Sequence, residues 1–497
     1  MLYKHRGRTV PLVTAVTSSG LDARSPTTES GRAWATLFIT SVSMFLVSMD
    51  VTIVSVALPD ISRDYSGTSS ATLSWVFTAY NVTFAALLLL AGKLGDRWGR
   101  KRSFQIGLLM FLGASVLAAI APGAGILIGA RTLQAAGSAL IYPASLALLL
   151  LEFPVNRRSM AIGVWGGIAG LGAAIGPTLG AMLVEWAGWR WVFFINVPFV
   201  TAALLAGVVY LRESKGDRGA ERFDPIAVPL AAVAVGLLVL GVVQGGPWGW
   251  SDPRVLACFV GTAVLFPVFV WRSAHHPRPL LDLDLFRLRS FSAGCGAQAL
   301  FIGSFFGWLV LMPSFFQSIW GWSPLAAGFA LAPSPAISAL ISPFAGRAAD
   351  HIGHRGLIIL GTLSSAIGMV WWVLAIGPEA HYLRDVMPGM ILLGLGGGAG
   401  FSTLTGAIMR DVPARFYSMA GAARSTIFQL GSAIGIAMAI ALLGPPEDAV
   451  VSDYARTWTM GAIGALGCAF VIVVAYPARR IDGEVWAAAR RPVPSTA

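Results

Sequence analysis

The amino-acid sequence predicts an all-α polytopic membrane protein, built as two six-helix bundles with two further helices inserted between them. Hydrophobic residues make up 56% of the 497 residues, charged residues only 12%, and the mean hydropathy is +0.72. In soluble domains roughly a quarter of the residues are charged. A chain with so few charged and so many apolar residues needs a bilayer to cover its apolar surface. The number of long apolar runs and a motif that occurs twice predict how the helices are grouped.

The apolar runs each have the length of about 20 residues that an α-helix needs to cross roughly 30 Å of hydrocarbon. By this criterion there are about fourteen such runs. Their approximate limits are residues 34–58, 72–91, 103–121, 124–150, 160–184, 190–211, 225–244, 254–271, 291–317, 324–345, 357–376, 385–408, 418–444 and 457–477.

A short charged motif lies in two of the gaps between these runs. Residues 92–101 and 346–355 both read Gly, three residues, Asp, two residues, Gly and then basic residues or histidine. The first copy follows the second run and the second copy follows the tenth, whereas a plain six-helix duplication would place it after the eighth. Two extra helices, 225–244 and 254–271, are therefore expected between the halves. Internal repeats of this kind are typical of transporters.

This arrangement predicts five segments. They are a disordered cytoplasmic tail at 1–33, an N-terminal six-helix bundle at 34–212, two inserted helices with their loops at 213–280, a C-terminal six-helix bundle at 281–478 and a second cytoplasmic tail at 479–497. The first segment is polar and rich in Ser, Thr, Gly and Arg, as disordered segments are. No short apolar core with a small-residue cleavage site precedes the first run, so we expect no cleaved signal peptide.

The basic residues predict the orientation in the membrane. The two tails and the even-numbered gaps hold 28 of the 35 Lys and Arg residues. Because positive charge concentrates in cytoplasmic loops, both termini are expected in the cytoplasm. The net charge of +11 is explained by this topology, so no nucleic-acid partner is expected.

Cofactor chemistry has little support in the sequence. The three cysteines, Cys258, Cys295 and Cys468, lie in or beside apolar runs and are too far apart for a zinc motif. All six histidines fall in tails or loops, where they cannot ligate a membrane haem. No phosphate-binding loop with Lys and Ser or Thr is present. We therefore expect no metal, no cofactor and no enzymatic activity, with transport driven by an ion gradient.

Two opposite charges lie at matched depth in the first and fourth runs. Asp50 is about eight residues, or about 12 Å, from the outer end of its helix, and Arg131 is about 10 Å from the outer end of its own. Charged residues inside a bilayer are costly and mark functional sites by default. Asp50 and Arg131 are therefore candidates for a proton-coupling pair. The alternative, that Asp50 only hydrogen-bonds neighbouring backbone and never titrates, stays open.

The fifth run is rich in glycine and contains an internal proline. Gly172, Gly176, Pro177 and Gly180 form an ordered segment within it. Small residues at this spacing allow close helix contact, and the proline removes one backbone hydrogen bond.

Several other polar and aromatic residues lie within the apolar runs. Arg424 is expected to extend its side chain to the cytoplasmic surface, with contact to an anionic substrate group as the alternative. Glu152 and Glu185 are expected at the membrane interface. The residues considered as a possible cavity lining are Tyr80, Asn81, Tyr142, Gln298, Phe305 and Trp308.

These motifs resemble those of the fourteen-helix drug:proton antiporters of the major facilitator superfamily. Gly92, Asp96, Gly99, Arg100 and Lys101 match that superfamily's cytoplasmic signature. Residues 131–137 resemble its motif Arg-x-x-Gln-Gly-x-Gly, with Ala135 in place of the first glycine. Residues 172–181 resemble the antiporter motif Gly-x-x-x-Gly-Pro-x-x-Gly-Gly, with Ala181 in place of the last glycine.

The resemblance implies a proton-coupled efflux antiporter that exports amphipathic drugs or antibiotics by alternating access. It implies a bacterial plasma-membrane protein that works as a monomer, with the cytoplasmic signature acting as a conformational latch between the bundles. An exporter of a lipid or endogenous metabolite remains an alternative. A solute importer is a further one, although the antiporter motif weighs against it.

Overall fold

The computed structural model describes residues 31–214, 224–276, 279–444 and 449–477, and every regular element in these ranges is helical. Fourteen helical segments in this part of the chain are long and apolar enough to cross a membrane. The predicted all-α membrane fold and the number of spans are therefore confirmed.

The first six spans form what we call the N-terminal bundle. Its helices are α1 (Gly31–Asp64), the short α2 (Ser70–Leu73), α3 (Trp75–Trp98), α4 (Arg100–Ala119), α5 (Ala124–Glu152), α6 (Arg158–Ala187), the short α7 (Trp191–Phe194) and α8 (Asn196–Tyr210). Within it, α1 packs on α6, and α5 packs on both α3 and α4.

The last six spans form the C-terminal bundle. Its helices are α11 (Arg289–Ser318), α12 (Pro324–Leu331), α13 (Pro333–Ile352), α14 (His354–Ala375), α15 (Met387–Met409), α16 (Tyr417–Leu443) and α17 (Val451–Ala475). A single π-helical turn, Tyr382–Val386, leads into α15. Here α11 packs on α16 and α17, while α15 packs on α13 and α14.

The two helices between the bundles are α9 (Ala227–Trp248) and α10 (Pro253–His275). Helix α9 packs on α3 and, less extensively, on α16, and α10 packs on α9. An ion pair between Asp224 and Arg272 joins the start of α9 to the end of α10, with Arg272 Nη2 2.9 Å from Asp224 Oδ1. The pair of helices is thus attached to the bundles chiefly through α9.

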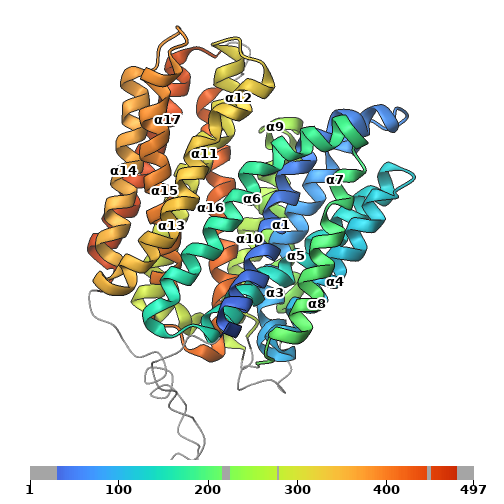
Figure 1. Ribbon diagram of the computed structural model, residues 1–497, viewed down its shortest axis with the longest axis vertical. Helices are drawn as coiled ribbons and strands as arrows, with labels where there is room; N and C mark the ends of the chain where they lie inside the picture. The colour runs from blue at the N-terminus through green and yellow to red at the C-terminus, as the bar shows by residue number, and fades with distance from the viewer. Residues whose placement is uncertain (1–30, 215–223, 277–278, 445–448, 478–497) are drawn as a thin grey trace, which may run out of the picture.

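The two bundles lie side by side, with α6 and α13 adjacent at the middle of the molecule (Figure 1). A further contact between the bundles joins α3 to α16. These contacts correspond under the duplication, because α3 and α13 each carry one copy of the charged motif. The described chain starts and ends at the same end of the molecule, as an even number of spans requires.

Helix limits differ from the predicted ones where a helix continues beyond the apolar run. Helix α1 begins at Gly31, inside the segment expected as a tail, while residues 1–30 and 478–497 lie outside the described part. The two motif copies are helical and do not form loops, with Gly99 (φ 111°) and Gly353 (φ 91°) ending α3 and α13. Hydropathy reports where the hydrocarbon ends, whereas a helix continues wherever its backbone groups find partners.

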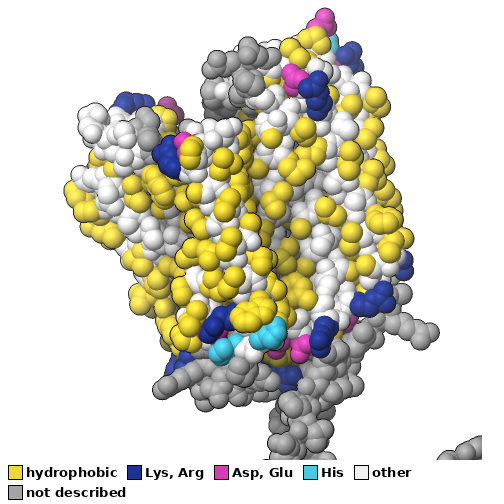
Figure 2. All heavy atoms as spheres, turned by 180° about the vertical axis from the view of Figure 1, so that it is seen from behind, with side chains coloured by type: hydrophobic (Ala, Val, Ile, Leu, Met, Phe, Trp, Pro, Cys, Tyr) yellow, Lys and Arg dark blue, Asp and Glu magenta, His cyan; other side chains and the backbone are white. Residues whose placement is uncertain are grey.

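Large apolar side chains cover the flank of the molecule, and charged ones gather at its two ends (Figure 2). Leu205, Val209, Leu360 and Phe470 are each more than 60% exposed although they are large and apolar. Such a surface is stable only against lipid tails, which agrees with membrane insertion.

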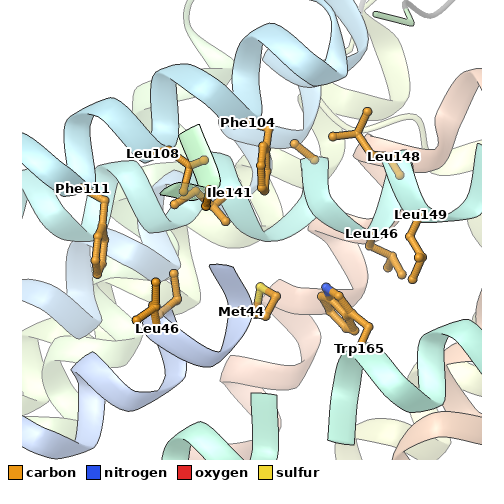
Figure 3. Close-up of a cluster of buried hydrophobic side chains, with 14 of the residues drawn as sticks. Met44, Leu46, Phe104, Leu108, Phe111, Ile141, Leu146, Leu148, Leu149 and Trp165 are labelled. Carbon is orange, nitrogen blue, oxygen red and sulfur yellow. The ribbon is translucent and has the colours of Figure 1, made fainter. Parts of the chain in front are cut away.

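The interior of the N-terminal bundle is packed with apolar side chains from α1, α4, α5 and α6 (Figure 3). Those labelled are Met44, Leu46, Phe104, Leu108, Phe111, Ile141, Leu146, Leu148, Leu149 and Trp165. Lipid is as apolar as this core, so helix association depends on close van der Waals contact. Gly107 and Gly137 supply such contact between α4 and α5, since a Cβ on Gly107 would lie 2.8 Å from the Gly137 carbonyl oxygen.

Candidate functional site

Asp50 and Arg131 form an ion pair inside the N-terminal bundle. Arg131 Nη1 of α5 lies 2.5 Å from Asp50 Oδ2 of α1, and the side chains are 1% exposed for Arg131 and 0% for Asp50. The pairing expected from their matched depth is confirmed. A buried pair of this kind is stable only when the remaining hydrogen-bonding capacity of both groups is also satisfied.

Two amides complete the surroundings of the Asp50 carboxylate. Gln134 Nε2 donates to Asp50 Oδ1 at 3.1 Å, and Asn196 Nδ2 donates to the same oxygen at 3.0 Å. Gln134 also donates to the Ser115 hydroxyl at 2.8 Å. Three helices, α1, α5 and α8, therefore meet at this carboxylate, and α4 joins them through Ser115. We call Asp50, Arg131, Gln134, Asn196 and Ser115 the ionic network.

The Arg131 guanidinium is held on its other sides by α3 and α5. It donates to Gln134 Oε1 at 2.8 Å and to the Val76 carbonyl at 3.3 Å, and it lies 4.3 Å above the Tyr80 ring. The Tyr80 hydroxyl donates to Ser138 at 2.8 Å and the side chain is 1% exposed. Tyr80 thus supports the ionic network, and its expected part in a cavity lining stays a prediction.

The charge balance of the network depends on one carboxylate. Its one carboxylate carries the negative charge that Arg131 neutralises, and a proton on Asp50 would remove that charge and the charge-assisted hydrogen bond with it. Arg131 would then retain neutral partners and the Tyr80 ring. The charge of Asp50 therefore strengthens the link between α1 and α5.

Three members of the network, Gln134, Asn196 and Ser115, were not assigned by sequence reasoning, although a signal was present for the two amides. Gln134 is the glutamine of the Arg-x-x-Gln segment, and Asn196 precedes Val-Pro at the start of α8. Both are amides within apolar spans, where an unpartnered amide is costly. That rule selects them as members of a buried polar site, but it does not identify their partner.

The glycines of the antiporter motif contact the part of α1 that carries Asp50. A Cβ on Gly172 would overlap the Phe45 carbonyl, and one on Gly180 would lie 2.9 Å from the Ile53 carbonyl. A Cβ on Gly176 would overlap the Thr52 hydroxyl. Pro177 lies in the same stretch of α6 and lacks the backbone N–H of a helical residue. Helix α6 therefore packs backbone to backbone on the turns that flank Asp50.

The first copy of the charged motif joins α3 to the start of α16. Asp96 accepts hydrogen bonds from the backbone N–H of Met419 at 2.9 Å and of Ser418 at 3.4 Å. Arg100 lies 3.0 Å from Asp96 and donates to the Ala414 carbonyl at 2.6 Å. A carboxylate at a helix N-terminus is favourable both as a cap and for the helix dipole. We call this contact the first latch.

Gly92 brings the two helices of the first latch together. A Cβ at this position would overlap the Ala422 Cβ and lie 2.7 Å from the Ser418 carbonyl oxygen. Glycine is required here because α3 and α16 approach backbone to backbone.

Two other residues of the cytoplasmic signature, Gly99 and Lys101, make their contacts within the N-terminal bundle. Lys101 Nζ donates to the carbonyls of Val208 at 2.7 Å and Leu211 at 2.8 Å, at the end of α8. Glu213 accepts from the backbone N–H of Lys101 at 3.1 Å and packs against Gly99, where a Cβ would overlap its carboxylate. The expectation that Lys101 belongs to the contact between bundles is therefore wrong, because its side chain caps α8.

The second copy of the motif joins α13 to the start of α6 in the same way. Asp350 accepts from the backbone N–H of Ser159 at 3.0 Å and of Met160 at 2.9 Å, and a Cβ on Gly346 would overlap the Ser159 carbonyl. His354 Nε2 lies 2.8 Å from the Ser159 hydroxyl, at the motif position that Arg100 occupies in the first copy. We call this contact the second latch.

The remaining residues expected to line a cavity are distributed over different surroundings. Trp308 is 1% exposed and packs on Trp372 within the C-terminal bundle, and Phe305 packs on Trp308, so both belong to a core. Gln298 is also buried. Asn81 is half-buried and donates to the Phe77 carbonyl.

Arg424 and Tyr142 occupy the region between the bundles. Arg424 is 2% exposed and lies 3.5 Å from the half-buried Tyr142 hydroxyl of α5. The expectation that Arg424 extends to the cytoplasmic surface is therefore wrong. In the described residues no group of three or more His, Cys, Asp or Glu side chains could hold a metal ion.

Two membrane-spanning helical bundles that meet at duplicated latches, with a buried ionic network in one of them, define a multi-pass membrane transporter. The family profile described as Major Facilitator Superfamily matches residues 40–436, and the chain belongs to this family.

Curated relatives cover most of the chain. The tetracenomycin C resistance and export protein of Streptomyces glaucescens is 31% identical over 88% of this chain and 84% of its own length. The multidrug resistance protein Stp of Mycobacterium tuberculosis is 33% identical over 81% of this chain and 74% of its own length. The methylenomycin A resistance protein of Bacillus subtilis is 30% identical over 88% and 90%.

Solved structures share the fold. The human organic anion transporter MFSD10 superposes with a TM-score of 0.65 at 14% identity, covering 90% of this chain and all of that one. The proton:xylose symporter XylE superposes with a TM-score of 0.63 at 13% identity, covering 90% and 97%. At this identity the likeness concerns the fold alone.

Proposed function

We propose that this chain is a proton-coupled antiporter that exports amphipathic drugs or antibiotics across the plasma membrane of a bacterium. The observation that carries the proposal is the set of relatives, because three of them, named for antibiotic or multidrug resistance, align with at least 74% of their own length at 30% identity or more. The buried carboxylate of the ionic network and the glycine contact between α6 and α1 are consistent with coupling to protons.

Asp50 is the proposed proton site. It is the carboxylate at the centre of a network that four helices share, so its charge state bears on how those helices pack. Protonation from the outside would release Arg131, and loss of the proton to the cytoplasm would restore the pair. Because α6 contacts α1 through Gly172, Gly176 and Gly180, a shift of α1 would be transmitted to α6.

The two latches are the proposed gate on the cytoplasmic side. Both termini and most Lys and Arg residues are assigned to that side by the distribution of positive charge. When the latches are engaged, as here, the bundles are held together at this end and the binding region is closed to the cytoplasm. Transport would require Asp96 and Asp350 to release the N-termini of α16 and α6. One copy of the chain contains all of these parts, so a monomer is the proposed working unit.

The test combines a susceptibility panel with transport by the purified protein. Cells that express the chain are expected to tolerate higher concentrations of several amphipathic antibiotics than cells with an empty vector. In vesicles, an imposed pH gradient is expected to drive efflux of ethidium, and collapse of the gradient with an ionophore should stop it. Unchanged susceptibility together with gradient-independent ethidium movement would contradict the proposal, and efflux of a lipid or metabolite alone would support the alternative exporter.

A further inference from the structure

Arg424 is a buried cation that lacks an acidic partner. It is one of three arginines among the largest fully buried side chains, and the other two form ion pairs, Arg100 with Asp96 and Arg131 with Asp50. Among the described residues no carboxylate lies within ion-pair distance of Arg424. Since an arginine keeps its charge in proteins, this charge is buried without compensation.

The contacts of Arg424 are long and neutral. Its guanidinium lies 3.4 Å from the Thr405 hydroxyl and 3.5 Å from those of Tyr142 and Ser425, at the limit of hydrogen bonding. Its buried Nε has no hydrogen-bond partner. A hydroxyl can accept a hydrogen bond from arginine but cannot neutralise it, so the site retains capacity for an anion.

A second donor without a partner lies in the same region. The Trp165 Nε1 of α6 is buried and has no hydrogen-bond partner, and the Trp165 ring lies 5.5 Å from that of Tyr142. The Phe84 ring of α3 lies 6.0 Å from the Tyr142 ring. The region therefore offers aromatic surface together with unsatisfied N–H donors.

Tyr142 marks where this region is accessible. It is half-buried, whereas every other residue of α5 from Gly137 to Leu150 is buried. Its neighbours Phe84, Trp165 and Arg424 come from α3 and α6 of one bundle and α16 of the other. Tyr142 therefore lies where the two bundles meet, which is the region in which transporters of this architecture bind their cargo.

We propose that Arg424 binds the acidic group of an aromatic organic acid, a carboxylate or an ionised acidic hydroxyl, while Phe84, Tyr142 and Trp165 pack on its rings. The planar guanidinium suits two oxygens of one anion. This inference rests on the proposed export function and specifies the chemical class of one cargo. The C-terminal bundle would then contribute the charge that selects the cargo, and the N-terminal bundle most of the aromatic surface.

The experiment compares acids with neutral compounds of the same shape on the purified full-length protein. Binding of 1-naphthaleneacetate and 9-anthracenecarboxylate is measured by calorimetry at pH 7 beside the corresponding primary amides. The wild-type protein is expected to bind each acid at least about tenfold more tightly than its amide. Arg424→Gln should bind the amides within about twofold of wild type and lose the preference for the acids. Arg424→Lys should keep part of the preference for the acids.

The matched control is Arg456→Gln, since Arg456 is 65% exposed on α17 and paired with Asp453 at the surface. It should behave as wild type. A wild-type protein without acid preference, or an Arg424→Gln protein that keeps it, would overturn the inference.

A second variant keeps the inference testable if Arg424→Gln cannot be purified. Thr405→Val combined with Tyr142→Phe removes two of the neutral acceptors that compete with an anion for Arg424 and should strengthen the acid preference at least about threefold. An unchanged preference in this variant would also overturn the inference. Gradient-driven ethidium efflux in the same preparation tests the proposed function separately, so the failure of either idea is recognised on its own.

Discussion

The two bundles have the same architecture but hold charge in different ways. The interior of the N-terminal bundle contains a closed ionic network in which Asp50 and Arg131 satisfy one another. The interior of the C-terminal bundle is dominated by aromatic rings, among them Trp308, Trp372 and Trp458, and its one deep arginine, Arg424, has no carboxylate within reach in the described chain.

This difference indicates that duplication preserved the helical scaffold while the two halves acquired different polar residues. A paired charge responds to a proton, because protonation changes its pairing. An unpaired buried cation responds to an anionic ligand, because the ligand supplies the missing charge. The latches also differ in one residue, since Arg100 pairs with Asp96 in the first and His354 contacts Ser159 in the second.

The largest effect is expected from Asp50→Asn. The amide keeps the size of the carboxylate but cannot carry a proton or neutralise Arg131, so gradient-driven ethidium efflux from vesicles should fall to the level of protein-free vesicles. Ethidium binding should persist. Asp50→Glu, which keeps a titrating group, is the control and should retain partial transport. Efflux at the wild-type rate that still follows the pH gradient would show that the proton site lies elsewhere.

Arg131→Ala should be nearly as damaging, because it leaves Asp50 buried without its cation. Removal of one partner from a buried pair costs about 3–5 kcal/mol, so both efflux and the thermal unfolding temperature should drop. Arg131→Lys keeps the charge but loses the planar fork and should show intermediate efflux. If alanine and lysine give the same transport rate, the charge of Arg131 has no part in coupling.

Gly176→Val tests whether α6 must touch α1 beside Asp50. The added side chain would overlap the Thr52 hydroxyl, and overpacking of this kind costs about 1–3 kcal/mol. Efflux should fall several-fold. Gly170→Val in the same helix is the matched control, since a Cβ there meets nothing within 4 Å. Equal losses in the two variants would contradict a specific role for the contact.

The latches should differ in the size of their effects. Asp96→Asn removes a helix cap and leaves the buried Arg100 without its carboxylate, whereas Asp350→Asn mainly removes a cap. Loss of a cap costs about 1 kcal/mol, so Asp350→Asn should lower the initial efflux rate about fivefold. Asp96→Asn should lower the rate by a larger factor. Each variant should change the efflux rate of every cargo by a similar factor, which is measured with two unrelated substrates. A change confined to one cargo would assign the residue to cargo binding.

The smallest effect is expected at Asp64, the last residue of α1. Hydrogen bonds from Trp189 Nε1 (2.8 Å) and Arg190 (2.7 Å) hold the pKa of this carboxyl below its ordinary value of 3.8. A lowered pKa in the folded state means that the contribution to stability is complete above 3.8 and is lost as the pH falls through the lower folded value. The side chain is 45% exposed, so the contribution is small.

Thermal unfolding of wild type and Asp64→Asn over this acidic range measures the contribution of Asp64. The difference between them should be present at neutral pH and shrink below pH 3.8. A difference that grows on acidification would contradict this account.

Much of the fold could be predicted from local sequence because the bilayer imposes a simple rule. Each span requires about 20 apolar residues, so counting runs predicted all fourteen spans, and the repeated motif located the inserted pair. Depth along a helix is likewise local, at about 1.5 Å per residue, and it placed Asp50 opposite Arg131. The helix ends were less predictable, since α3 and α13 continue through the polar motifs to Gly99 and Gly353.

Only the tertiary structure decided the partners of the polar residues. Gln134 and Asn196 are recognisable as buried amides, but their meeting at one carboxylate depends on how α5 and α8 rotate about their own axes. Hydropathy carries no information on that rotation. The same reason explains why Lys101 was assigned to the wrong contact and Arg424 to the surface. What the sequence determined by itself is how many helices cross the membrane and how deep each charge lies, while which charge meets which was decided by packing across the bundles.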